Sequence, residues 1–379
     1  MDNIKKLIGE SFLDIAKAVE TGEFGKVKVG ITLLGSELGV DNILKGAEAA
    51  SKDGVDVVAI GPKVETDLEI IEVSDEVEAH KKMEELIDSD YIQGAVTMHY
   101  NFDIGVSTVG RVITPAFGKE MLIATTTGTS DTDRTISMFK NTIYGIITAK
   151  SLGIRNPTLG ILNVDNARAV ERCLKELQTN GYDINFGESA RSDGGVIMRG
   201  NDLLTASVDV MVTDSLTGNI LMKMFSSFTT GGSFESTGFG YGPGIGFENK
   251  RIINILSRAS GTPVVANAIK YVASLAKGNL NEIKASEYKR VTDAKFFDII
   301  DELKNKQVKV EERYVIPEKE IVTGEISGID ILELEMAVES LHKAGIYAES
   351  GMGCTGPVIL VSETNIEKSK KLLTEIKCL

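Results

Sequence analysis

The sequence predicts an α/β protein: a mostly parallel β-sheet with helices on both faces, followed by a small C-terminal α/β unit. From Lys26 onward, short apolar runs alternate with helical patterns, and these runs are apolar on both faces, as in strands of a covered parallel sheet. The 379 residues exceed what one core usually holds. We therefore expect a first domain over residues 1–305 and a second unit over 306–379.

Seven segments of the first domain are predicted strands, because each is short, apolar and flanked by turn or helical sequence. In chain order they are residues 26–34, 55–61, 92–99, 121–128, 157–164, 208–214 and 251–257. A helix predicted over 165–178 places Cys173 on its apolar stripe, in register with Val170 and Leu177. Cys173 is therefore expected in the core. Another helix is predicted over 262–276.

The segment from Gly231 to Gly246 contains seven glycines in sixteen residues, which is too many for a helix or a stable strand. We expect a mobile loop there, and its composition fits either a loop beside the site or a plain surface connection. After residue 306 the pattern changes. The predicted final unit has a helix over 328–345, a glycine-rich loop around Cys354, a strand over 358–362 and a closing helix over 365–377.

Charge and composition exclude several classes of function. The chain has 41 lysines and arginines against 55 aspartates and glutamates, a net charge of −14, which argues against nucleic acid or an anionic membrane as the main partner. No apolar run is long enough to span a membrane, and the N-terminus lacks a secretory signal, so a cytoplasmic location is expected. Three cysteines and three histidines form no disulfide framework or metal motif, so we predict no metal and no tightly bound cofactor.

Small polar residues follow three predicted strands, in the kind of loop that binds ligands in open parallel sheets. Backbone N–H groups at a helix start, helped by hydroxyls, can hold phosphate without cationic side chains. The same residue types also cap helices, so both interpretations stay open. The candidate ligands in these loops are Gly35, Ser36, Thr127, Gly128, Thr129, Asp214, Ser215, Thr217, Gly218 and Asn219.

Arg258 lies between a predicted strand and a predicted helix, with Ser257 and Ser260 beside it. A guanidinium there could grip phosphate through two parallel hydrogen bonds, although a solvated surface arginine is the alternative. His99, at the end of a predicted strand, is either a general base or a capping residue, and His80 is expected on the surface.

Cys354 has glycine immediately before it, at Gly353, and further glycines at Gly351 and Gly356. A thiolate is a strong nucleophile, and glycine-flanked backbone can offer N–H donors to an oxyanion. No base stands next to it in sequence, so a tight turn with an incidental cysteine is equally compatible.

In order along the chain, residues 151–165, 183–189, 208–225 and 257–269 resemble the motifs of the acyl-carrier-protein:phosphate acyltransferases of phospholipid synthesis. Residues 29–50 resemble that family's opening segment, and 257–260 are also similar to a segment of phosphate acetyltransferases. Both families exchange an acyl thioester with an acyl phosphate. The resemblance implies that Arg258 and residues 215–219 bind phosphate, with Arg258 and Asn219 at the catalytic centre. Val264 replaces the aspartate that serves the acetyltransferases as base.

The whole chain, including Cys354, resembles the alpha subunits of component C of glycine reductase complexes. This resemblance implies that Cys354 receives an acetyl group as a thioester from the carboxymethylated selenoprotein, component A. Inorganic phosphate, the co-substrate, then releases acetyl phosphate. The implied partners are component A and the beta subunit of component C, in an oligomeric assembly. A free-standing acyl-phosphate synthase of lipid synthesis and a non-catalytic scaffold subunit are the alternatives.

Overall fold

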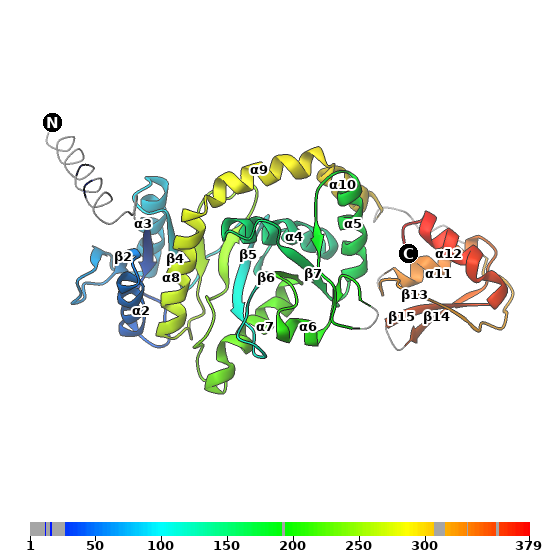
Figure 1. Cartoon of the computed structure of the whole chain (residues 1–379), viewed down its shortest axis with the longest axis horizontal. Helices are drawn as coiled ribbons and strands as arrows, with labels where there is room; N and C mark the ends of the chain where they lie inside the picture. Colours follow the sequence, from blue (N-terminus) through cyan, green and yellow to red (C-terminus); the bar gives the residue numbers. More distant parts are fainter. Residues whose placement is uncertain are drawn as a thin grey trace.

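A computed structural model describes residues 27–191, 194–306, 315–331, 333–353 and 356–379, together with positions 12 and 16. Figure 1 shows a large sheet with helices on its faces and a smaller unit with its own sheet at one end of the molecule.

The strands of the large sheet are β1 (Lys28–Thr32), β2 (Asp56–Gly61), β3 (Glu69–Glu72), β4 (Gly94–Thr97), β5 (Val106–Ile113), β6 (Glu120–Thr129), β7 (Thr158–Leu162), β8 (Asn185–Phe186), β9 (Ile197–Met198), β10 (Val210–Val212), β11 (Gly242–Ile245) and β12 (Ile253–Ile255). The helices around it are α2 (Val40–Lys52), α3 (Glu76–Asp88), α4 (Arg134–Ser151), α5 (Ala167–Thr179), α6 (Gly200–Thr205), α7 (Ser215–Ser227), α8 (Thr262–Lys277), α9 (Leu280–Asp293) and α10 (Phe296–Lys306), with a 3₁₀ turn η1 (Phe228–Thr230). All seven predicted strands are present.

The large sheet is mostly parallel, with the order β3-β2-β1-β4-β12-β11-β5-β6-β10-β7-β8 and β9 paired to β7. This confirms the predicted fold class. The parallelism is interrupted once, because β11 is antiparallel to β12 and to β5, and β5 is antiparallel to β6. The first parallel set, β3 to β12, therefore runs opposite to the second set, β6 to β8. The polar loops after β1 and β6 consequently do not share one carboxyl edge of the sheet.

Alternating side chains along the strands bury both faces of the sheet. Leu122 and Val210 point into the core shared with α2, α4, α5 and α8. Their strand neighbours Ile123 and Met211 point the other way and pack with Met222 of α7. On the first parallel set, α3 packs against side chains that point away from the core of α2 and α8, among them Val58 and Ile60 of β2. Strands buried on both sides read as continuous apolar runs, which is why these segments could be recognised from sequence.

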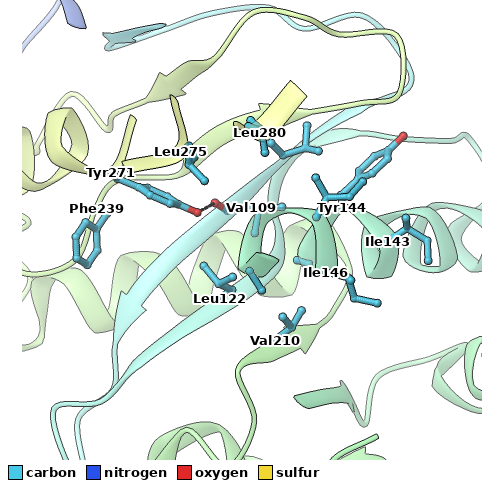
Figure 2. Close-up of a cluster of buried hydrophobic side chains, with 14 of the residues drawn as sticks. Val109, Leu122, Ile143, Tyr144, Ile146, Val210, Phe239, Tyr271, Leu275 and Leu280 are labelled. Carbon is cyan, nitrogen blue, oxygen red and sulfur yellow. Dashed lines mark hydrogen bonds between the residues drawn. The ribbon is translucent and has the colours of Figure 1, made fainter. Parts of the chain in front are cut away.

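The core beneath α4 and α8 is held by a hydrogen bond as well as by apolar packing (Figure 2). The hydroxyl of the fully buried Tyr271 donates to the carbonyl oxygen of Val109 on β5 at 3.0 Å, and its ring packs against Phe239. Burial raises the pKa of the Tyr271 hydroxyl, so it stays a donor. Cys173 is buried in this same cluster, as predicted.

The glycine-rich segment is the main correction to the predicted fold. Residues 242–245 form the buried central strand β11 rather than part of a mobile loop. A Cβ on Gly242 would lie 1.9 Å from the carbonyl oxygen of Val109, and one on Gly244 would lie 2.4 Å from the ring of Phe102. Glycine is used here because backbone and ring approach too closely for a side chain, so a composition typical of loops specifies a tightly packed strand.

The C-terminal unit contains β13 (Gly324–Ser327), α11 (Leu334–Lys343), β14 (Ala348–Gly353), β15 (Gly356–Val361), a 3₁₀ turn η2 (Glu363–Asn365) and α12 (Ile366–Glu375). Its three strands pair antiparallel in the order β13-β15-β14 around a separate apolar cluster. Arg172 of α5 pairs with Glu333, and Lys377 reaches Glu176 and Glu302 at 3.2 and 3.3 Å. The division between residues 305 and 306 stays a prediction.

Candidate functional site

A cavity of about 590 Å³ lies where the two parallel sets of the sheet meet. Segments far apart in the chain form its wall: the loops after β1, β4 and β12, the end of β6 and one side of α7. The lining residues are Glu37, Met98, His99, Tyr100, Asn101, Phe102, Thr127, Gly128, Asn219, Lys223, Tyr241, Ile255, Leu256, Ser257, Arg258 and Ala259. Five predicted site residues are therefore brought together: Thr127, Gly128, Asn219, Ser257 and Arg258.

Arg258 follows β12 and has an exposed side chain that lines the cavity. It makes no ion pair with any residue in the described part of the chain, so its charge is available to an anion. Its backbone is fixed, because its carbonyl oxygen accepts a hydrogen bond from the N–H of Glu37 at 2.9 Å. Gly35 and Ser36 precede Glu37 and hold this loop rather than line the cavity; Ser36 Oγ accepts from the N–H of Leu38 at 3.1 Å.

The end of β6 contributes backbone and hydroxyl groups. The N–H of Thr127 is already used, since it donates to Thr108 Oγ1 at 3.0 Å. Gly128 has φ near 82°, and a Cβ there would lie 2.7 Å from the carbonyl oxygen of Val106, so only glycine fits. Thr129 pairs with Val106 and is not part of the cavity wall.

Helix α7 begins at Ser215, and its N-terminus is occupied by its own cap. The Asp214 carboxylate accepts from the N–H and hydroxyl of Thr217 at 3.0 and 2.6 Å and pairs with Arg134 at 3.1 Å. Burial opposes its ionisation, but these bonds and the guanidinium lower the pKa of Asp214 below its usual value. Asp214, Ser215 and Thr217 lie outside the cavity wall, so capping is the role that the geometry supports for them.

The middle of α7 supplies the polar groups that do reach the cavity. Gly218 lets the helix lie directly on β6, because a Cβ there would be 1.8 Å from the carbonyl oxygen of Thr125. Asn219, the next residue, lines the cavity, and so does Lys223 one turn later. Lys223 was missed in the sequence, although its spacing of four residues from Asn219 indicates the same helix face.

Lys223 is held by three neighbours. Its ammonium lies 3.1 Å from Ser257 Oγ, 3.4 Å from a carboxylate oxygen of Glu235 and 5.4 Å from the ring centroid of Tyr241. Burial disfavours the charged form, but Tyr241 and Glu235 outweigh it and raise the pKa of Lys223. The ammonium therefore stays charged, and the cavity wall carries two cations.

The serine, histidine and cysteine candidates differ in their position relative to the cavity. Ser260 is fully buried and donates to Glu235 at 2.9 Å, so it supports the site from behind. His99 is exposed at the cavity, which leaves its role as base or capping residue open. His80 is half-buried rather than on the surface and lies 3.0 Å from Thr97 Oγ1; burial and the nearby His99 lower its pKa. Cys354 lies outside the described residues, so its role stays a prediction.

Within the described ranges, no cluster of histidine, cysteine, aspartate or glutamate could hold a metal ion. No helix among the residues that the structure covers is long and apolar enough to cross a membrane.

The chain belongs to the fatty acid synthesis protein family, whose model it matches over residues 27–360. Within that family it belongs with the alpha subunits of component C. It is 62% identical over 380 residues to the glycine/sarcosine/betaine reductase complex component C subunit alpha of Peptoclostridium acidaminophilum, covering 99% of both chains.

Two phosphate acyltransferases match more narrowly. That of Fervidobacterium nodosum is 40% identical over 82 residues, 21% of this chain and 22% of the relative. That of Thermotoga petrophila is 25% identical over 236 residues, 52% of this chain and 67% of the relative. Among solved structures, a branched-chain phosphotransacylase from Enterococcus faecalis V583 matches with a TM-score of 0.47 and 16% identity, covering 66% of this chain and 99% of that chain.

Proposed function

We propose that this chain is the acyl-transfer subunit of a glycine reductase complex, carrying an acetyl group as a Cys354 thioester and releasing it to phosphate as acetyl phosphate. The observation that carries the proposal is the cavity with two cations, Arg258 and Lys223, beside the Asn219 amide. The similarity to a component C alpha subunit supports the assignment to such a complex. The complex would supply component A and the beta subunit as partners.

In the release step, a phosphate oxygen attacks the carbonyl carbon of the thioester, the carbon–sulfur bond breaks and the Cys354 thiolate leaves. Arg258 and Lys223 would hold the phosphate dianion, and the Asn219 amide could donate to the carbonyl oxygen as negative charge develops there. A thioester suits this step because it is activated toward oxygen nucleophiles, whereas an ester on serine would be more stable.

The step that forms the thioester is a reduction. Conversion of the carboxymethyl selenoether into an acetyl thioester consumes two electrons and releases one hydroxide ion. As the carbon–selenium bond breaks, a thiol of the selenoprotein would be oxidised to a selenium–sulfur bond, and one carboxylate oxygen would leave as hydroxide. The complex therefore has to supply a reducing thiol, and this chain has to supply only the acceptor Cys354.

Mass spectrometry tests the proposal directly. The wild-type chain, incubated with its partners and carboxymethylated selenoprotein but without phosphate, should gain an acetyl adduct on Cys354 that disappears when phosphate or arsenate is added. Cys354→Ser should abolish acetyl phosphate formation, while Cys173→Ser, a change at a buried core position, serves as the control for thiol specificity. An adduct on Cys173 or Cys378, or full turnover by Cys354→Ser, would favour the scaffold alternative.

One observation favours the lipid-type acyl-phosphate synthase as a second candidate. A neighbouring cavity of about 560 Å³ shares Tyr100, Asn101 and Phe102 with the first, and aromatic side chains including Tyr144 and Phe247 line it. A long acyl chain could extend from one cavity into the other. Turnover of long-chain acyl phosphates faster than acetyl phosphate would support this candidate.

A further inference from the structure

Glu235 is a buried acidic residue with one partner in the wall of the cavity, Lys223, and one partner behind the wall, Ser260. Its side chain is 4% exposed, and its two carboxylate oxygens are divided between Ser260, at 2.9 Å, and Lys223, at 3.4 Å. A carboxylate taken out of water is unfavourable unless it is paired and hydrogen-bonded, so its position indicates a specific partner.

The backbone around Glu235 is fixed as firmly as its side chain. Its N–H donates to the carbonyl oxygen of Ala259 at 2.9 Å, and its carbonyl oxygen accepts from the N–H of Gly261 at 2.8 Å. Glu235 is thereby joined to the segment that carries Ser257 and Arg258. The same residue contacts Lys223 of α7, so it links the two elements that supply the cations of the cavity.

We propose that Lys223 is a second phosphate ligand and that Glu235 is a positioning residue that fixes its ammonium beside Arg258. The inference rests on the proposed function, in which phosphate is the co-substrate. The side chain of Lys223 is 47% exposed, so without these partners it would occupy several rotamers and its ammonium would have no fixed position. Contacts with Glu235, Ser257 and Tyr241 restrict the ammonium to the cavity wall, where its positive charge attracts an anion.

Glu235 can act in two ways that predict opposite results. As a bare negative charge near the site it repels phosphate, so Glu235→Gln would tighten phosphate binding. As the residue that holds Lys223 it favours phosphate, so Glu235→Gln would weaken binding. We expect weakening by roughly three- to tenfold, because one charged hydrogen bond to Lys223 is lost. The change in sign separates positioning from charge alone.

Lys223 itself is tested by Lys223→Met, which keeps an unbranched apolar stem and removes the charge. We expect the dissociation constant for phosphate to rise about 10- to 100-fold, the range of one hydrogen bond between charged groups. Lys223→Arg keeps the charge and should recover most of the affinity. Lys270→Met is the matched control. Lys270 lies on α8 rather than α7, and its ammonium pairs with the exposed Asp53 at 2.8 Å.

The experiment measures binding of inorganic phosphate to the full chain by calorimetry, and separately the arsenate-dependent hydrolysis of acetyl phosphate. Weaker binding in Lys223→Met and Glu235→Gln, with the control and Lys223→Arg close to wild type, supports the inference. Wild-type affinity in Lys223→Met, or tighter binding in Glu235→Gln, overturns it even if the enzyme is active. A wild-type chain that neither binds phosphate nor hydrolyses acetyl phosphate overturns the proposed function as well.

Discussion

Replacing Gly218 by alanine tests whether the contact between α7 and β6 positions the cavity. The new Cβ would lie 1.8 Å from the carbonyl oxygen of Thr125, and Cβ atoms essentially never approach another atom closer than 3.0 Å. The helix must therefore move outward by at least 1.2 Å, the difference between these two distances. Overpacking of this kind costs about 1–3 kcal/mol of folding free energy.

The effect on activity should be larger, because Asn219 and Lys223 move with the helix. A displacement of about 1 Å in a positioning element can reduce the rate about 100-fold. Urea unfolding and arsenate-dependent acetyl phosphate hydrolysis measure the two effects separately. Gly200→Ala is the matched control, since no atom lies within 4 Å of its added Cβ in α6. Equal activity and stability in the two variants would refute the argument that this contact sets the geometry of the cavity.

Two further predictions concern single charges. Arg258→Ala should raise the phosphate concentration needed for release of the acetyl group and leave thioester formation intact, which single-turnover assays of each half-reaction can separate; equal loss of both steps would speak against a phosphate role. Lys284 is 7% exposed, and burial lowers its pKa to about 8 from an ordinary value of 10.5. Between these values the unfolded chain binds a proton that the folded chain lacks, so this group makes the protein more stable as pH rises. The stability advantage of Lys284→Met over wild type should shrink by about 2 kcal/mol between about pH 7.5 and about pH 9.5, whereas a constant difference would contradict the burial argument.

Sequence patterns predicted seven strands of the large sheet because those strands are apolar on both faces and separated by helices, but missed the short parallel strands β3, β8 and β9. They did not predict β5 or β11, which pair antiparallel in the middle of the sheet. The reason at β11 is physical: Gly242 and Gly244 are required by the approach of Val109 and Phe102, and such tertiary contacts leave no periodic signal in the chain.

The site was predicted only in part, because local sequence patterns show some of its residues and tertiary contacts define the others. Arg258 and Ser257 could be found because they lie between a strand and a helix. The polar residues at the start of α7 were ambiguous, since capping and phosphate binding use the same side chains, and the structure has Asp214 as the cap. Glu235 could not be found, because its partners Lys223 and Ser260 are 12 and 25 residues away and nothing local distinguishes it from a surface glutamate.

The reversal of direction within the large sheet has a mechanical consequence for the cavity. Arg258 belongs to the first parallel set through β12, whereas Lys223 follows β10 of the second set. An anion bound to both residues would act as a cross-link between two sets of strands that are joined within the sheet by β11 and β5. Such a ligand stabilises the closed arrangement of the two sets as well as the folded state. The strands between the two sets should therefore open locally less often when the anion is bound. The occupied and empty proteins should accordingly differ in stiffness at the middle of the sheet far more than at its edges.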